Sequence, residues 1–281
     1  MLPETLGVIG LGAVGGSVAW QAARSGIARV VGYDPSTRDG VAAVRAGAVT
    51  ELVRDAADVV RAADLVVLAA SPRQAETVLR GVADALARCR PWCTDVAPVK
   101  HPIMTVAKEL DLAASFAGSH PFVDFGADGF KGAGPDRLAG AVVYVTPLAG
   151  GERAAAEIGD FWSRTMRAYT VTLDADRHDA LLAWTSHLPR AVAAALAATL
   201  GANAPAGVTV GRAAVDATRS AQSGVEQWSD VLLANRDQVL AALTAFAVTV
   251  DELEQALRAG DRRRVEGWLA AGAGWRARFD T

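Results

Sequence analysis

The sequence of 281 residues has few cysteines, no long apolar run and little net charge. Its two cysteines, Cys89 and Cys93, are too few for a disulfide framework or a cysteine-rich metal site, and we expect both to be reduced and structural. The formal net charge of −3 provides no general attraction to nucleic acid or to an anionic membrane. Small anionic ligands would therefore have to be bound by local basic side chains.

No apolar stretch reaches the roughly 18 uncharged residues that a membrane span needs. The start of the chain also lacks the basic segment and apolar segment of a secretion signal. These absences predict a cytoplasmic protein that has no membrane or nucleic-acid partner.

What the sequence does contain is a large apolar fraction: 51% of the residues are hydrophobic and 21% are charged, as in a globular protein with a substantial core. Up to about residue 173, short β-branched runs alternate with alanine-rich helical segments, which predicts an α/β fold with a mostly parallel sheet covered on both faces. After the first strand–helix–strand unit, the expected strands cover residues 65–69, 92–96, 115–118, 141–145 and 168–173. The expected helices cover residues 36–46, 55–62, 72–87, 100–110 and 151–165.

A glycine-rich turn follows the first apolar run, where Gly10, Gly12 and Gly15 have the spacing G-x-G-x-x-G. In a Rossmann-type dinucleotide site, the first glycine allows the turn, the second lets a pyrophosphate approach, and the third lets the next helix pack closely. Ala13 and Val14 begin that helix, whose free N–H groups would face the phosphates. A tight turn without a ligand is the alternative interpretation.

A second apolar run, residues 28–33, ends at Asp34, where an acid would accept hydrogen bonds from the adenosine ribose. An acid at this position repels a 2′-phosphate, so the expected cofactor is NAD, with NADP less favoured. Arg38 would bind such a phosphate or would be a solvated residue of the next helix.

Ligands of parallel sheets bind beyond the carboxyl ends of the strands, and two of the expected ends carry short polar motifs. Ser71 and Pro72 follow one strand, so Ser71 would contact the cofactor or cap the helix that opens at Pro72. Asp95 and Lys100 flank the turn after the next strand, as a functional pair or as a structural ion pair or helix cap.

A third strand end carries His120, directly before Pro121. Proline removes a backbone donor and stiffens the loop, and imidazole titrates near neutrality, which suits proton transfer. His120 is therefore a candidate catalytic residue, with a structural histidine as the alternative.

From about residue 175 the strand signal ends, and helical patterns cover residues 176–201, 208–222, 225–258 and 261–277. Pro189 should kink the first of these helices and free a carbonyl near residue 185. An all-α domain with large apolar faces after a nucleotide domain predicts a homodimer, and the alternative is a helical domain that folds back on the first domain.

Arg219 has the planar cation that binds a carboxylate in bidentate fashion. Asp216, three residues earlier, is a possible ion partner, and Trp228 is either core or a wall of a ligand site.

Several spaced motifs together resemble those of the prephenate and arogenate dehydrogenases. They are Gly10-Leu11-Gly12-Ala13-Val14-Gly15-Gly16-Ser17, Gly118-Ser119-His120-Pro121, His178-Asp179, Ser186-His187-Leu188-Pro189, and Thr218-Arg219 with Trp228 and Asn235. The resemblance runs through nearly the whole chain in the same order.

The resemblance implies an NAD-binding domain over residues 1–173 and a helical dimerisation and substrate domain over residues 174–281, with the active site between them. Such enzymes oxidatively decarboxylate a cyclohexadienyl carboxylate, prephenate or arogenate, in tyrosine biosynthesis. By similarity, His120 would accept the proton of the ring hydroxyl and Arg219 would bind a substrate carboxylate. Ser186 and Trp228 would also bind substrate.

Three positions depart from the usual family pattern. Pro98 stands where a serine usually assists the histidine, and Arg190 stands where a second histidine is common. Asp124, Phe125 and Gly126 replace a Gly-x-Glu stretch. Arg190 would bind a second carboxylate or form an ion pair between the domains. The loss of the serine makes 4-amino-4-deoxyprephenate an alternative substrate.

Two other kinds of function stay open. One is a different Rossmann enzyme with a helical domain, such as a β-hydroxyacid dehydrogenase or an imine reductase; the lack of lysine after residue 173 counts against the first. The other is a non-enzymatic dinucleotide-binding dimer, against which the intact His120 and Arg219 count.

Overall fold

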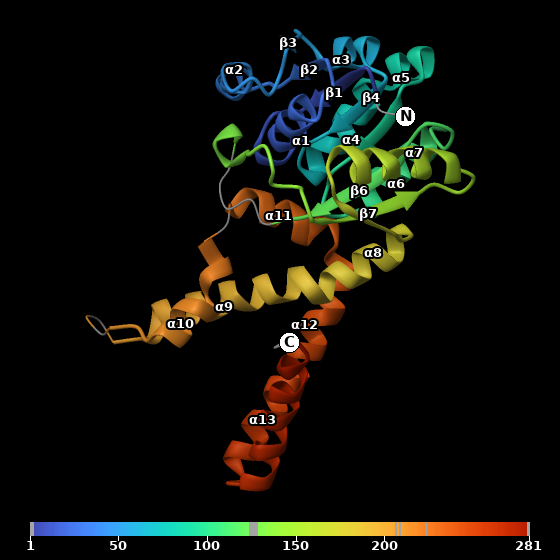
Figure 1. Cartoon of the computed structure of the whole chain (residues 1–281). Helices are drawn as coiled ribbons and strands as arrows, with labels where there is room; N and C mark the ends of the chain where they lie inside the picture. Colours follow the sequence, from blue (N-terminus) through green and yellow to red (C-terminus); the bar gives the residue numbers. More distant parts are fainter. Residues whose placement is uncertain (1–2, 124–128, 206, 208, 223, 280–281) are drawn as a thin grey trace. The chain divides into compact units, whose positions relative to one another are not determined.

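The computed structural model describes residues 3–123, 129–205, 207, 209–222 and 224–279. The chain divides into two compact units, residues 1–235 and residues 236–281. Among the described residues, all strands belong to the first unit, and the second unit consists of the last helices (Figure 1). The expected boundary between residues 173 and 174 stays a prediction.

Five parallel strands form the main sheet in the order β3-β2-β1-β4-β5 (Figure 1). Their bounds are β1 Thr5–Ile9, β2 Arg29–Tyr33, β3 Glu51–Leu52, β4 Leu65–Leu68 and β5 Trp92–Asp95. The sequence analysis missed β3, because this two-residue edge strand is exposed and has no apolar pattern. The predicted Rossmann-type α/β fold followed by a helical region is confirmed.

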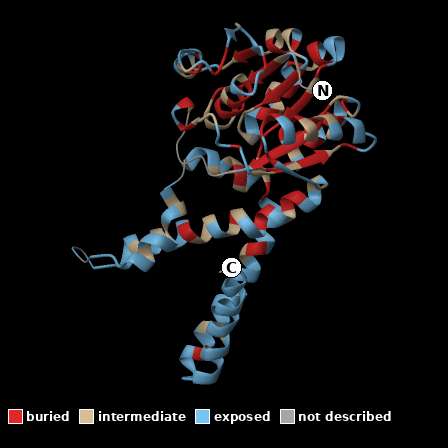
Figure 2. Cartoon of the chain, in the orientation of Figure 1, coloured by how far each residue is buried: buried red, intermediate tan, exposed pale blue. Residues whose placement is uncertain are grey.

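Helices cover both faces of this sheet, so its strands contribute to two separate cores. In β4, Leu65 and Val67 pack into one core, whereas Val66 and Leu68 pack into the other. Figure 2 shows the strands of the main sheet as largely buried. The bounds of the helices are α1 Ala13–Arg24, α2 Thr37–Arg45, α3 Ala56–Ala62, α4 Pro72–Gly81, α5 Ala83–Cys89, α6 His101–Glu109 and α7 Glu152–Asp160.

Two expected helices differ from the structure in this region. The helix expected over residues 72–87 breaks at Val82, directly after Gly81, a residue of low helix propensity. The helix expected over residues 151–165 ends in a π-helical turn, Phe161–Thr165. Cys89 is exposed, Cys93 is buried, and both are free thiols.

A second, three-stranded sheet has the order β6-β7-β8, with β6 Ala117–Phe122, β7 Val142–Pro147 and β8 Tyr169–Thr172. β6 and β7 are antiparallel, while β7 and β8 are parallel and joined through α7. The sheet is therefore not a simple continuation of the parallel one; an isolated bridge between Cys93 and Phe116 links the two sheets.

The predicted end of the strand that carries His120 is wrong. The sequence places His120 and Pro121 after a strand that ends at residue 118, but β6 continues through both and pairs His120 with Tyr144. β6 is an edge strand, and proline within a sheet is tolerated on edge strands because there an N–H can face away from the ladder.

The helical part of the first unit begins with α8 Ala175–Leu182 and α9 Leu188–Asn203, which a π-helical turn, Ala183–His187, joins into one long helix (Figure 1). In that turn the N–H of Leu188 donates to Ala183 O, one residue further back than in an α-helix. The sequence predicted a kink before Pro189; the structure has this widened turn there, and the kink and the free carbonyl near residue 185 stay predictions.

Three further helical segments complete the first unit: α10 Arg212–Ala217, the 3₁₀ turn Arg219–Gln222 and α11 Val225–Ala234. The second unit consists of α12 Arg236–Arg258, α13 Arg262–Arg276 and a short 3₁₀ turn. The single helix expected over residues 225–258 is wrong, because the chain breaks at Asn235. Among the described residues, no single helix is long and apolar enough to cross a membrane; α11 and α12 meet that criterion only when counted together as one bent segment.

Candidate active site

The glycine-rich turn after β1 is tightly packed against β4. Gly10 has φ +93°, and a Cβ on it would lie 2.2 Å from Ala69 O. A Cβ on Gly15 would lie 1.9 Å from Gly10 O. Both clashes involve backbone atoms, which cannot move aside cheaply, so these two positions require glycine.

Gly12, in contrast, faces open space. The nearest atom to a Cβ on Gly12 would be Gly129 Cα at 4.0 Å. Gly12 is also the N-cap of α1, and among the described residues no side chain caps this helix start. The N–H groups that begin with Ala13 and Val14 are therefore free to bind an anion. This open, uncapped turn fits the pyrophosphate of a dinucleotide.

Asp34 lies at the end of β2, and its carboxylate points toward this turn. Oδ2 accepts the N–H of Leu11 at 2.6 Å, and Oδ1 accepts the N–H of Ser36 at 2.7 Å. Each oxygen keeps a second lone pair, so the carboxylate fits a ribose hydroxyl. The side chain of Arg38 is 87% exposed and lies 3.7 Å from the carboxylate of Asp39.

Ser71 and Pro72 open α4 in the way that the helix-cap interpretation predicts. Ser71 is the N-cap, and its Oγ accepts the N–H of Gln74 at 3.4 Å. Pro72 occupies the first turn. Contact of these residues with a cofactor stays a prediction.

Asp95 and Lys100 form a buried ion pair, which confirms their structural interpretation. Lys100 Nζ donates to Asp95 Oδ2 and to Ser119 O, at 2.5 Å in each case. Asp95 Oδ1 accepts the N–H of Ser119 at 3.2 Å. These bonds hold the residue directly before His120 against the end of β5.

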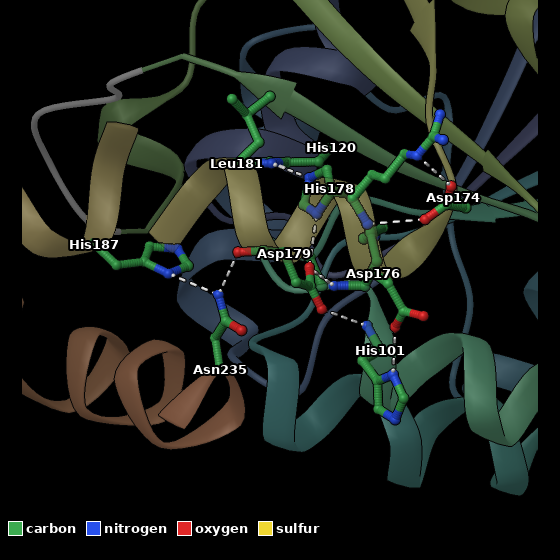
Figure 3. A network of polar contacts seen from close by, with 12 residues as sticks. His101, His120, Asp174, Asp176, His178, Asp179, Leu181, His187 and Asn235 are labelled. Atoms are coloured by element: carbon green, nitrogen blue, oxygen red, sulfur yellow. Dashed lines mark hydrogen bonds and ion pairs between the residues drawn. The ribbon is translucent and has the colours of Figure 1, made fainter. Parts of the chain in front are cut away.

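His120 belongs to a buried cluster of imidazoles. Its Nδ1 lies 3.0 Å from His178 Nε2, and His178 Nδ1 lies 2.7 Å from Asp179 Oδ1. Figure 3 shows these three side chains joined in that order. The ring of Tyr144, the cross-strand neighbour of His120, lies beside both imidazoles. Its centroid is 6.2 Å from the ring centroid of His120 and 5.4 Å from that of His178.

Asp179 is held at the N-terminus of α6. Oδ1 accepts the N–H of Lys100 at 2.7 Å, and Oδ2 accepts the N–H of His101 at 2.8 Å. A helix start favours a negative charge, so α6 fixes the carboxylate in its ionised form. Although burial raises the pKa of Asp179, hydrogen bonds from His178 and from these two N–H groups outweigh it and bring the pKa below its usual value.

The histidines of the cluster are neutral at physiological pH. Burial, together with the charges of His178, Lys100 and His187, holds the pKa of His120 well below its usual value of 6.5. Burial also lowers the pKa of His178, against the effect of its hydrogen bond to Asp179. A neutral, buried imidazole with one nitrogen already bonded is suited to accept a proton on the other.

A further group of contacts connects this cluster to the motifs of the helical region. Asn235 Nδ2 donates to Asp179 O at 2.8 Å and lies 3.1 Å from His187 Nδ1 (Figure 3). The ring of His187 contacts that of Trp228, with centroids 6.0 Å apart. The guanidinium of Arg190 lies over the ring of Trp228, 3.9 Å from its centroid.

Arg190 also reaches the turn that carries Arg219. Its Nη1 donates to Ser220 O at 2.6 Å, next to Arg219. Arg219 itself is 75% exposed and forms the expected ion pair with Asp216. Ser186 is half-buried on the π-helical turn.

The structure thus gathers most of the predicted motifs into one set of contacts, although it assigns them no role. The sequence analysis quoted His178, Asp179 and Asn235 but gave them no function, and it did not single out Tyr144. The predicted departure at Asp124, Phe125 and Gly126 lies outside the described residues.

Two family models match the chain. The model for the prephenate dehydrogenase nucleotide-binding domain matches residues 18–169. The model for the prephenate dehydrogenase dimerization domain matches residues 174–271.

Individual relatives span most of the chain. A cyclohexadienyl dehydrogenase of Zymomonas mobilis is 30% identical over 271 residues, which cover 91% of this chain and 89% of that protein. A prephenate dehydrogenase of Bacillus subtilis is 26% identical over 258 residues, which cover 90% of this chain and 70% of that protein. The crystal structure of prephenate dehydrogenase from A. aeolicus, in complex with hydroxyphenyl propionate and NAD+, has a TM-score of 0.88 at 24% identity and covers 98% of both chains.

Proposed function

Since this chain belongs to the prephenate dehydrogenase family of oxidoreductases, we propose that it catalyses the NAD-dependent oxidative decarboxylation of prephenate or arogenate in tyrosine biosynthesis. The names of its relatives support this substrate class, since one is a cyclohexadienyl dehydrogenase. The A. aeolicus enzyme was crystallised with NAD+ and hydroxyphenyl propionate, which supports NAD as the cofactor and a ring-bearing acid as the substrate of this chain.

The observation that carries the proposal is the state of His120. The imidazole is buried and its pKa is lowered, chiefly by burial, so it is neutral at physiological pH. Its Nδ1 is engaged by His178, which leaves Nε2 for a substrate hydroxyl. A positioned base of this kind contributes on the order of 10² to 10⁴ in rate.

In the proposed reaction, Nε2 of His120 accepts the proton of the ring hydroxyl as hydride leaves the same ring carbon. NAD, when bound, supplies the hydride acceptor. The bond between the ring and its carboxylate then breaks, and its electron pair completes the aromatic ring as carbon dioxide departs. His120 returns its proton to the phenolate oxygen, so the imidazole ends the cycle neutral.

Two arginines are assigned to the carboxylates of the substrate. Arg219 would bind one carboxylate in exchange for its exposed ion pair with Asp216. Arg190, fixed on Trp228, would bind a second. Ser186, on the same turn as His187, would contact the substrate side chain.

The cofactor site is assigned to Gly10, Gly12, Gly15 and the helix start at Ala13 and Val14, with Asp34 on the adenosine ribose. The carboxylate of Asp34 would repel a 2′-phosphate, which favours NAD over NADP. Ser71 and Pro72, at the start of α4, would contact the cofactor.

The matched dimerization domain supports a homodimer. Exposed apolar side chains in the second unit, among them Leu240, Leu257 and Leu269, fit a surface that a second copy covers. The cytoplasmic location stays a prediction.

A second candidate substrate is 4-amino-4-deoxyprephenate, which has an amino group in place of the ring hydroxyl. The observation that favours it is Pro98, which cannot donate the hydrogen bond that a serine would give to a ring hydroxyl.

Incubating the protein and NAD with prephenate, arogenate or the amino analogue, and recording NADH absorbance, tests these assignments. We expect NADH to form with prephenate or with arogenate. The other ring acids tested should give a much lower kcat/KM. NADH formation only with the amino analogue would replace the substrate assignment. NAD binding without reduction by any ring acid would favour a non-enzymatic dinucleotide-binding dimer.

A further inference from the structure

Asp179 is surrounded by hydrogen-bond donors, and this determines where the protons of the imidazole cluster lie. Its oxygens accept the backbone N–H groups of Lys100 and His101, at 2.7 and 2.8 Å. An ionised carboxylate has no proton to donate. His178 Nδ1, 2.7 Å from Oδ1, must therefore carry the hydrogen of that bond.

The position of the hydrogen on His178 also determines the position of the hydrogen on His120. A neutral imidazole with its hydrogen on Nδ1 has a lone pair on Nε2. His178 Nε2 is thus an acceptor, and His120 Nδ1, 3.0 Å away, must be the donor. The lone pair of His120 is then on Nε2, the nitrogen that remains for a ligand.

We propose that His178 and Asp179 are positioning residues that hold His120 in the tautomer with a bare Nε2, and so set it as a proton acceptor. This inference rests on the proposed role of His120 as the base. In solution a free imidazole favours neither nitrogen strongly, whereas this network permits only one arrangement. The same logic holds for the aspartate of serine-protease triads, whose replacement by asparagine costs about 10⁴ in kcat through the wrong tautomer.

The network also stabilises the charge that His120 gains during the reaction. When Nε2 takes a proton, the positive imidazolium lies two hydrogen bonds from the carboxylate of Asp179. Lys100 opposes that charge, but its own ion pair with Asp95 compensates it. The other titratable groups that face the cluster are His187 and Tyr144, from the π-helical turn and from β7.

The same arrangement compensates for Pro98, whose side chain cannot donate a hydrogen bond. A side chain at position 98 that donates a hydrogen bond is not needed to orient His120, because His178 already holds the ring through Nδ1. The orientation of the base is thus provided from α8 and not from the loop after β5.

The tautomers can be measured without substrate, by the ¹⁵N chemical shifts and two-bond couplings of the imidazoles in the full-length protein. The chain has 4 histidines, so each signal can be assigned by single substitution. We expect both His120 and His178 to have the hydrogen on Nδ1 and a bare Nε2 at neutral pH. A hydrogen on Nε2 of His120 would overturn the proposal, whatever substrate the enzyme turns over.

The functional test is Asp179→Asn, with Asp176→Asn as its matched control. An amide at position 179 has one acceptor oxygen. Placed at the Oδ1 position, this oxygen accepts from His178 Nδ1 and from the N–H of Lys100 but leaves the N–H of His101 facing the NH₂ group. Placed at the Oδ2 position, it accepts only from His101 and turns the NH₂ group toward His178 Nδ1, which can then no longer carry its hydrogen. We expect most of the variant to hold His120 with its hydrogen on Nε2, and the carboxylate that stabilises the imidazolium is lost as well, so kcat should fall at least 100-fold with KM within about threefold. Asp176 is on the same helix with its side chain 87% exposed, and its variant should keep the native kcat.

Three readouts separate positioning from a general loss of structure. The NAD affinity of Asp179→Asn should stay close to native, and its melting curve should stay cooperative, although the midpoint falls because a buried N–H loses its acceptor. Its kcat should rise with pH where the native enzyme is level, because hydroxide replaces the base. If Asp179→Asn does not fold, His178→Gln takes its place, since its amide oxygen would accept from His120 Nδ1 and keep more activity than His178→Leu. Native kcat in Asp179→Asn, or equal kcat in the two His178 variants, would overturn the proposal.

Discussion

Lys100 and Asp95 form an ion pair that no solvent reaches: Nζ lies 2.5 Å from Oδ2, and both side chains are 0% exposed. The pair bonds to both backbone polar groups of Ser119, the residue before His120. Burial lowers the pKa of Lys100, and the carboxylate of Asp95 opposes that change. The pair thus fixes the backbone on which the imidazole cluster is built.

Lys100→Met is expected to destabilise the protein by about 3–5 kcal/mol, because it leaves the buried carboxylate of Asp95 without its counter-charge. Urea unfolding measures the loss. Lys108→Met, on the exposed side of α6, should change the free energy of unfolding by less than about 0.5 kcal/mol. Similar midpoints for Lys100→Met and the native protein would mean that the pair contributes little.

His120→Asn is expected to lower kcat on the order of 10² to 10⁴, with a modest change of KM, since the base acts on the reacting hydroxyl and adds little to ground-state binding. Steady-state kinetics with the substrate identified above measures both constants. A kcat within a few-fold of native would exclude His120 as the base.

Arg219→Ala should chiefly raise KM, because the guanidinium is assigned to binding a substrate carboxylate and not to the transfer of the proton or the hydride. Arg212→Ala is the control: this arginine also lies beside Asp216, at 3.5 Å, and its side chain is 93% exposed. If both variants have the native KM, Arg219 does not bind the substrate.

Gly12→Ala and Gly15→Ala should separate cofactor binding from stability. A Cβ on Gly12 meets open space, so the variant should fold with the native melting temperature and lose NAD affinity. A Cβ on Gly15 would lie 1.9 Å from Gly10 O, so this variant should unfold more easily. Melting curves with and without NAD test both; native NAD affinity in Gly12→Ala would exclude a pyrophosphate at this turn.

Stability should fall as the pH drops from about 6.5 toward 4, because burial, the first of several causes, lowers the pKa of His187 from 6.5 to about 4. Over this range the unfolded chain binds a proton that the folded chain does not, which costs folding on the order of 3 kcal/mol. His120 and His178 act in the same direction. Urea midpoints at pH 7 and pH 4.5 should therefore differ less in His187→Asn than in the native protein. An equal difference in both would contradict this account.

The features that the sequence predicted well are local. The spacing of Gly10, Gly12 and Gly15 determines a turn from a few neighbouring residues, and the acid at Asp34 follows at a fixed distance. The alternation of apolar runs predicted the α/β fold for the same reason, because each strand and helix shows its own periodicity.

The features that the sequence did not predict depend on distant neighbours. Whether Pro121 ends a strand depends on whether that strand is at an edge, which the residues around it do not show. The contact of His120 with His178 joins residues 58 positions apart. The break at Asn235 accompanies bonds of its side chain to Asp179 and His187, which no helical pattern contains.

The π-helical turn Ala183–His187 changes the rotational phase of the helix that contains it. Each residue of an α-helix advances the chain by about 100°, so a regular helix would place His187 about 80° around the axis from Asp179. One residue absorbed in the wider turn removes about 100° of that rotation and brings the two positions to within about 20° of each other. The amide of Asn235 can then reach both. A deletion of one residue from this turn would restore the regular winding and direct the imidazole of His187 away from the cluster.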